Sequence, residues 1–325
     1  MKKRITLWLL ATLFLANVSL AEAQQTGKIF RIGFLDNSTA AGSVSLLEVF
    51  RQELRKLGWI EGKNITIEYR FAEQRNERLA GLAADLVRLK VDLIVTSGGP
   101  TPFAAKEATT TIPIVMTTST NPVEEGLVAS LARPGGNVTG FAGLASELNT
   151  KRLEILKDAV PRLTRVAIMR QPGPATQWKE IRPAASALNL KLEEIETEID
   201  AKGLELAFQT AKQKQVGAIM PMVGRRFFAE RERIVELAGK YMLPAVYFQK
   251  EFVDQGGLMS YGADYNDLFR GAAVYVDKIL RGAKPADLPV QQATKFEFII
   301  NLKAAKQIGL TIPNRVLERA NQVIK

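Results

Sequence analysis

Small polar residues follow an apolar run in the first third of the chain, and their types suit the binding of a carboxylate. Ser97, Gly98 and Gly99 come shortly after the apolar run at 91–95, and Thr101 opens the helix-compatible stretch behind them. A helix N-terminus offers free backbone amides to an anion, and glycine lets a ligand come close to the main chain. A plain tight turn would account for the same residues without any ligand.

A second set of hydroxyl side chains occupies the matching place one strand later. Ser119 and Thr120 follow the apolar run at 112–116. The two runs and the helical stretch between them predict a parallel βαβ unit, and open parallel sheets bind ligands at the carboxyl ends of their strands. We therefore expect these hydroxyls to face the same carboxylate, unless they only cap the turn before Pro122.

The first predicted strand, 28–35, also ends in polar residues. Asp36, Asn37 and Ser38 follow it directly. A carboxylate beside an amide and a hydroxyl can hold an ammonium group or a sugar hydroxyl. The alternative is that Asp36 caps the next helix, for which Ser43 is the predicted N-cap.

The second half of the chain supplies further candidates at the ends of predicted strands. They are Gln171, Met222 and Gln249, with Arg170 beside the first of them and Phe248 or Tyr247 as a ring for stacking. Tyr261, Asp264 and Tyr265 form a YGADY cluster, in which a carboxylate between two rings suits an ammonium group. Asp264 could instead be the N-cap of its own helix.

The residue types that most often carry out catalysis are missing. The chain of 325 residues contains no His and no Cys, which removes the commonest general base, the usual nucleophile pairings and the usual zinc ligands. Gly135 and Gly136 lack the continuation of a phosphate loop, no GxGxxG follows the first strand, and no EF-hand spacing occurs. The sequence therefore favours a binding protein over an enzyme and predicts no catalytic residue, metal or cofactor.

The N-terminus has the pattern of an export signal. Three basic residues precede an apolar run at 5–16, and Ala21 and Ala23 supply the small residues that a signal peptidase requires. The run is shorter than the roughly 20 residues that span a bilayer. We expect a signal peptide at 1–23, cleavage near Ala23 and a periplasmic mature protein; a retained N-terminal anchor is the alternative.

The charge balance is basic, with a formal net charge of +10 at pH 7. Such an excess could serve nucleic acid or acidic surfaces. The basic residues are scattered over predicted helix faces among Asp and Glu, so we interpret them as a solvated surface and expect no nucleic acid partner.

Strand and helix patterns alternate along the mature chain in two series. This alternation predicts an α/β fold with two doubly wound, Rossmann-like lobes joined by a multi-strand hinge. The predicted lobes are an N-terminal lobe, 28–141 with 262–290, and a C-terminal lobe, 146–258 with 295–325. The same patterns predict a short helix at 123–131 and a single long helix at 225–241.

Five segments together carry a family resemblance. They are FRQELRKLGWIEGKNITIEYRFAEQ at 50–74, AADLVRLKVDLIVTSGG at 83–99, TTTIPIVMTTSTNPVEEGLVASLARPGGNVTG at 109–140, KRLEILKDAVP at 151–161 and TIPNRVLERANQVI at 311–324. With them the chain resembles ABC-transporter substrate-binding proteins of the tryptophan/tyrosine-type periplasmic-binding family.

The resemblance implies a type I periplasmic-binding fold with a small molecule held between the lobes. The implied protein is a monomer that closes on an amino acid or a related small carboxylate and delivers it to ABC permease and ATPase subunits. Asn121 stands before Pro122 where relatives of this type carry Asp, and Asn lacks the charge that could pair with an ammonium group. A ligand-sensing module of a membrane receptor and an exported α/β enzyme are the alternatives.

Overall fold

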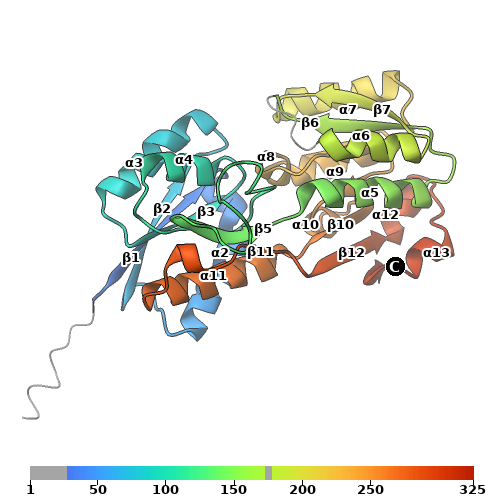
Figure 1. Cartoon of the computed structure of the whole chain (residues 1–325). Helices are drawn as coiled ribbons and strands as arrows, with labels where there is room; N and C mark the ends of the chain where they lie inside the picture. Colours follow the sequence, from blue (N-terminus) through green and yellow to red (C-terminus); the bar gives the residue numbers. More distant parts are fainter. Residues whose placement is uncertain (1–27, 173–177) are drawn as a thin grey trace, which may run out of the picture.

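The computed structural model describes residues 28–172 and 178–325. The predicted signal peptide, 1–23, lies outside these residues. Two α/β lobes lie side by side, the first at the left of Figure 1 and the second at the right. Within the described ranges, no helix is both long enough and apolar enough to cross a membrane.

The first lobe is built on a six-stranded sheet with the order β11-β5-β4-β3-β1-β2, in which all neighbours are parallel. The central strands β3, β4 and β5 are buried along their whole length, as expected for a parallel sheet covered on both faces. The strands are β1 (Phe30–Asp36), β2 (Ile65–Phe71), β3 (Leu93–Ser97), β4 (Ile114–Met116), β5 (Val138–Ala142) and β11 (Gln291–Gln292). The helices are α2 (Ala40–Lys56), η2 (Asn76–Arg78), α3 (Leu79–Arg88), α4 (Thr101–Ala108), α11 (Tyr265–Leu280) and η3 (Pro285–Asp287).

The second lobe contains two smaller sheets, β7-β6-β8 and β13-β12-β10-β9, linked by a bridge between Ile219 and Ala245. Only β10 and β12 pair antiparallel among its strand pairs in the described chain. The strands are β6 (Arg165–Arg170), β7 (Lys191–Glu196), β8 (Ala218–Pro221), β9 (Val246–Tyr247), β10 (Met259–Ala263), β12 (Phe296–Asn301) and β13 (Gln322–Ile324). The helices are α5 (Ala145–Ala159), α6 (Trp178–Ala187), α7 (Ala201–Gln213), α8 (Arg225–Ala229), α9 (Arg231–Lys240), α10 (Glu251–Asp254), α12 (Leu302–Gln307) and α13 (Asn314–Leu317).

The chain crosses between the lobes at three places, which together form the hinge. It passes from β5 into α5, from β10 into α11 and from β11 into β12, and α11 packs along α2 of the first lobe. Tyr261 packs against the hydrophobic cores of both lobes. The predicted two-lobed α/β fold is confirmed, whereas the residue boundaries of the predicted lobes stay a prediction.

One helix start differs from the prediction. α2 begins at Ala40, and its N-cap is Thr39, whose hydroxyl oxygen accepts a hydrogen bond from the Gly42 N–H at 3.0 Å. Ser43 is therefore not the N-cap. It lies one turn inside the helix, fully buried, with its hydroxyl on Asp36.

Two predicted helices differ from the structure. The stretch 123–131 forms turns and no helix, because Gly126 adopts a φ of +67° that a right-handed helix cannot continue. The stretch 225–241 forms two helices, α8 and α9, which meet at Glu230. α8 buries Phe227 and Phe228, and α9 buries Ile234, Leu237 and Ala238.

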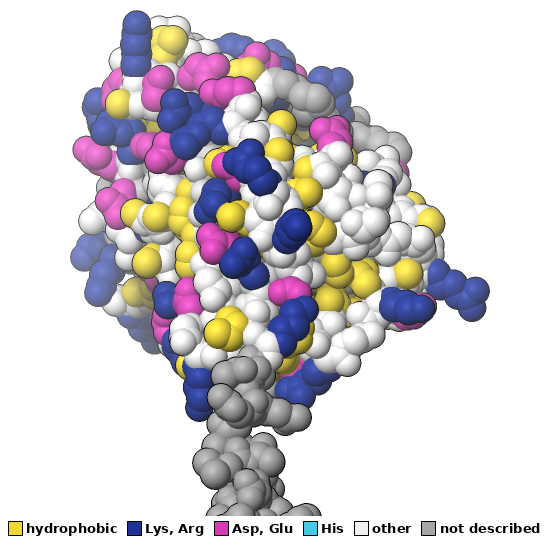
Figure 2. All heavy atoms as spheres, turned by 90° about the vertical axis from the view of Figure 1, so that its left-hand side faces the viewer, with side chains coloured by type: hydrophobic (Ala, Val, Ile, Leu, Met, Phe, Trp, Pro, Cys, Tyr) yellow, Lys and Arg dark blue, Asp and Glu magenta, His cyan; other side chains and the backbone are white. Residues whose placement is uncertain are grey.

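Charges of both signs are mixed on the surface. Figure 2 shows the outer end of the first lobe, where Lys and Arg side chains are interspersed with Asp and Glu side chains and do not gather in one patch. Ion pairs such as Lys28–Asp92 at 2.6 Å and Arg55–Glu48 at 2.5 Å join them. Basic and acidic side chains are therefore mixed on this face, and the interpretation of the basic excess as a solvated surface stays a prediction.

Candidate ligand-binding site

A cavity of about 470 Å³ lies between the lobes and is lined by residues of both. From the first lobe, the loops after β1, β3 and β4 reach it; from the second, the loops after β6, β8 and β9 do so. Each of these loops follows the carboxyl end of a parallel strand, the edge at which open α/β sheets bind ligands. The volume suits a small molecule.

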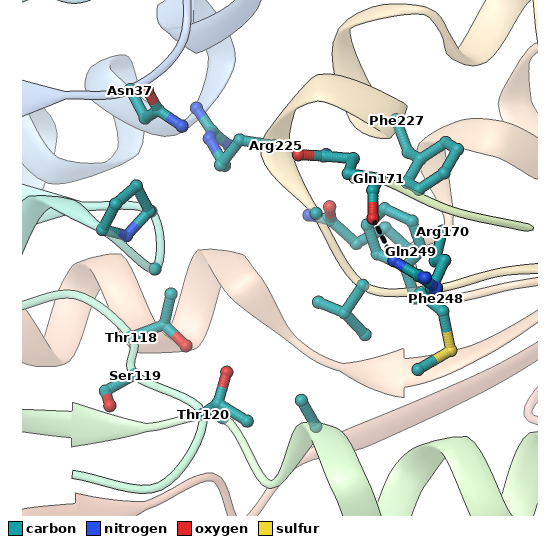
Figure 3. Close-up of a pocket in the computed structure, with 18 of the residues that line it drawn as sticks. Asn37, Thr118, Ser119, Thr120, Arg170, Gln171, Arg225, Phe227, Phe248 and Gln249 are labelled. Carbon is teal, nitrogen blue, oxygen red and sulfur yellow. Dashed lines mark hydrogen bonds between the residues drawn. The ribbon is translucent and has the colours of Figure 1, made fainter. Parts of the chain in front are cut away.

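Eight of the residues predicted from the sequence to bind a ligand line this cavity. They are Asn37, Gly98, Gly99, Ser119, Thr120, Gln171, Met222 and Gln249. Figure 3 shows the loop Thr118–Thr120 on one side of the cavity, with Gln171, Phe248 and Gln249 on the other. Their contact with a ligand stays a prediction, but their common location is a structural fact.

Four other predicted residues lie behind the cavity wall of the first lobe and do not line it. Asp36, Ser38 and Ser97 are buried at the end of neighbouring strands β1 and β3. The Thr101 hydroxyl donates a hydrogen bond to the Gly98 carbonyl at 2.8 Å, so it stabilises the turn. The backbone of Gly98 and Gly99, and not these side chains, faces the cavity.

The YGADY cluster lies partly on the cavity wall and partly behind it. Tyr265 lines the cavity, whereas Tyr261 and Asp264 do not. Asp264 is the N-cap of α11, where its Oδ1 accepts a hydrogen bond from the Asp267 N–H at 3.1 Å. The Tyr261 ring packs between the two cores, and its carbonyl accepts a hydrogen bond from Arg152 at 3.0 Å.

Arg152 is the strongest site residue that the sequence did not reveal. Its side chain is buried, with only 1% of the residue's surface exposed, and it lines the cavity from α5. Nη1 donates to the Tyr261 carbonyl at 3.0 Å and Nη2 donates to Asn149 Oδ1 at 2.5 Å, while Nε has no partner. No Asp or Glu of the described chain forms an ion pair with it, and burial lowers its pKa to about 10.

A buried guanidinium without an acidic partner destabilises the folded chain. The charge has lost its hydration, and no carboxylate of the described chain compensates for that loss. Burial also raises the pKa of Tyr265. The positive charges of Arg152 and Arg225 oppose that rise, so both guanidiniums lie close enough to the Tyr265 hydroxyl to affect its pKa. The cavity therefore offers a positive environment to the anionic group of a ligand.

Glu125 supplies an acidic group to the same cavity. It is half-buried, and its Oε2 accepts a hydrogen bond from the Ser119 hydroxyl at 2.8 Å. Burial raises the pKa of this carboxyl, and the nearby charge of Glu124 adds to the rise, although the hydrogen bonds from Ser119 and from the Asn121 backbone oppose it. Glu125 can thus accept an ammonium group in its ionised form or donate a hydrogen bond in its neutral form.

Asn121 lies outside the cavity lining. Its side chain is exposed, and its Oδ1 accepts a hydrogen bond from the Glu124 N–H at 3.3 Å. Asn121 therefore caps a turn and does not contribute to the polar groups of the cavity. Glu125, four residues further on, is the acid that faces the cavity.

Aromatic and apolar side chains complete the walls. Phe103 contributes from the first lobe, and Phe227 and Phe248 contribute from the second. Tyr247 lies in the core instead, where its ring stacks on Phe252 with centroids 4.7 Å apart. Arg170 also lines the cavity, but Glu194 and Glu196 form ion pairs with it. The walls suit an apolar body of aromatic size beside the charged groups.

The family model of the ABC transporter substrate binding proteins matches residues 42–324 of this chain. The chain belongs to this family. This substrate-binding protein is 27% identical to the tyrosine-binding protein of Clostridioides difficile over 271 aligned residues. The alignment covers 80% of this chain and 75% of that relative.

Two solved structures are similar over almost the whole substrate-binding protein. A conserved domain protein from Vibrio cholerae superposes with a TM-score of 0.84 at 28% identity, covering 91% of this chain and all of that one. The ABC domain from Streptococcus pneumoniae in complex with L-Trp superposes with a TM-score of 0.82 at 26% identity, covering 91% and 99%. A substrate-binding protein of an ABC transporter has a small-molecule ligand and membrane permease partners.

Glu125→Gln is expected to remove a pH dependence from the stability of this substrate-binding protein. The raised pKa means that the folded chain holds the Glu125 proton more tightly than the unfolded chain does. From the ordinary carboxyl pKa of 4.5 upward through the raised value, the wild type therefore loses stability relative to the variant as the pH rises. Urea unfolding at a series of pH values measures this difference, and parallel curves for the two proteins would contradict it.

Proposed function

We propose that this chain is the solute-binding component of an ABC transporter that captures an amino acid or a related small carboxylate between its lobes. The observation that carries the proposal is a cavity between two lobes that contains a buried, unpaired guanidinium, Arg152. Arginine forms bidentate, charge-assisted hydrogen bonds with a carboxylate. The apolar walls and Glu125 suit the remaining parts of an aromatic amino acid.

The two relatives with named ligands support the same class of solute. One is called a tyrosine-binding protein and the other was solved with L-Trp. The mechanism follows from the position of the cavity: a solute that contacts both lobes binds the closed form more tightly and so shifts the hinge equilibrium toward it.

The proposed setting is the periplasm, after cleavage of the signal peptide near Ala23, with the protein acting as a monomer. The closed form would dock on a permease served by ATPase subunits. The protein would hold its solute unchanged and act neither as an enzyme nor as a carrier of a metal or cofactor.

Isothermal titration calorimetry with matched solutes tests the proposal. L-Tryptophan and L-tyrosine are expected to bind with one site per chain, and tryptamine and tyramine, which lack the carboxylate, are expected to bind at least about 30-fold more weakly, since a charged hydrogen bond contributes about 2 kcal/mol or more. Native mass spectrometry of protein purified without denaturant extends the test to solutes retained from the cell. Failure of every amino acid and small carboxylate to bind, or turnover of a bound solute by the protein alone, would contradict the proposal.

A further inference from the structure

A buried ion pair joins the two lobes at the edge of the cavity. Asp36 ends β1 of the first lobe, and Arg225 begins α8 of the second lobe. Arg225 Nη2 lies 3.2 Å from Asp36 Oδ2, and the side chains are 8% and 0% exposed. This contact exists only when the lobes are close together, because its two partners belong to different lobes.

The first lobe holds its side of this pair in place. Asp36 Oδ1 accepts a hydrogen bond from the Ser38 N–H at 2.8 Å, and Oδ2 accepts one from the Ser43 hydroxyl at 2.7 Å. Arg225 Nη2 also donates to the Ser43 oxygen at 3.0 Å. Asp36 and Ser43 are therefore oriented for the guanidinium before the lobes meet.

The path of the Arg225 side chain fixes its direction. It passes Gly98, where a Cβ atom would lie 3.2 Å from Arg225 Cγ and 3.2 Å from Asn37 Cβ, and where φ is +101°. Figure 3 shows Arg225 reaching across the cavity toward Asn37. The glycine thus leaves the space through which the arginine of one lobe enters the other.

Part of the guanidinium remains without a hydrogen-bond partner, although its carbon Cζ lies over the Phe228 ring, 5.5 Å from the ring centroid. Nε and Nη1 of Arg225 are buried and form no hydrogen bond, and the residue lines the cavity. A buried donor without an acceptor destabilises the folded chain, because it has lost its hydrogen bond to water. An anionic oxygen in the cavity would remove this destabilisation.

We propose that Arg225 is a ligand-binding residue that also latches the lobes: Nη2 binds Asp36 and Ser43 on closure, and Nε and Nη1 bind an anionic group of the solute. The solute-binding task rests on the proposed function, whereas the latch operates without solute. A solute with a carboxylate would favour the closed form more than the matched amine without one. Only the carboxylate can accept hydrogen bonds from Nε and Nη1 of Arg225.

Small-angle scattering of protein freed of solute tests the latch. Asp36→Asn and Arg225→Gln are expected to increase the radius of gyration, because each removes a charge of the pair. Arg225→Lys is expected to keep the compact form, because it retains the charge. Arg226→Gln is the control: Arg226 is the next residue of α8, and it faces Glu198 at 3.7 Å outside the cavity. A radius unchanged in both Asp36→Asn and Arg225→Gln would overturn the latch.

Calorimetry with L-tryptophan and tryptamine tests the solute-binding task. Arg225→Lys, which keeps the compact form, is expected to lose about 30-fold or more in affinity for L-tryptophan and less than about threefold for tryptamine. Equal losses for both solutes, or none for either, would overturn this task and leave the proposed function standing. If the wild type binds no amino acid and no small carboxylate, the proposed function and this task both fail, while scattering still decides the latch.

Discussion

Arg152→Met is expected to weaken the binding of a carboxylate solute by about 100-fold, which corresponds to about 3 kcal/mol. Removal of one partner of a buried, hydrogen-bonded charge pair typically weakens binding by about this much. The guanidinium lines the cavity without an acidic partner among the described residues. It is thus available to a ligand. Met keeps a long apolar side chain and removes the charge.

The same variant is expected to keep its fold. Loss of the guanidinium leaves the Tyr261 carbonyl and Asn149 Oδ1 without their donor, but it also removes a buried charge whose desolvation opposes folding. These effects oppose one another, so the free energy of unfolding should change by less than about 2 kcal/mol.

Calorimetry and urea unfolding on the same preparations separate the two effects. Lys151→Met is the matched control, because Lys151 precedes Arg152 on α5 but is 44% exposed and pairs with Glu154 at 2.7 Å. It should bind like the wild type. Severe destabilisation of Arg152→Met together with unchanged affinity would show that Arg152 is structural.

Gly140→Ala is expected to destabilise the first lobe by about 3–5 kcal/mol, the sum of backbone strain and overpacking. Gly140 has a φ of +126°, and a Cβ atom there would lie 2.2 Å from the Met116 carbonyl oxygen and 2.5 Å from its nitrogen. Met116 pairs with Gly140 across β4 and β5. The clash therefore involves backbone atoms that cannot move without breaking the sheet.

Urea unfolding measures this loss, with Gly136→Ala as the control. A Cβ atom at Gly136 would meet no atom within 4 Å, so this second variant should stay within about 1 kcal/mol of the wild type. Because β4 leads into the loop Thr118–Thr120 of the cavity, Gly140→Ala should also weaken solute binding. Equal stability of the two variants would contradict the account.

Local patterns in the sequence were sufficient for most of the fold. The first strand, predicted at 28–35, lies at 30–36 in the structure, because an apolar run and its flanking turn are local signals. Asp264 is the N-cap of α11, which was the alternative to its predicted place in an ammonium site. Ser43 was misjudged, because its partners Asp36 and Arg225 are set by the tertiary fold, and Arg225 lies 182 residues away in the chain.

The cavity was predicted in position and only partly in its residues. The ends of parallel strands identify the binding edge from the sequence alone, which is why eight predicted residues line the cavity. The charged groups were missed because their exposure depends on the packing of two lobes. Arg152 did leave one signal: it shares a helical spacing with the buried residues Leu148, Ile155 and Leu156, and an Arg on an apolar helix face is unusual.

The most direct test of the central claim is a crystal structure of the protein with the solute that it retains on purification. We expect the solute between the lobes, with an anionic oxygen at hydrogen-bonding distance, about 3 Å, from the guanidinium of Arg152. A solute bound elsewhere, or one held in the cavity with no anionic group near Arg152, would contradict the account.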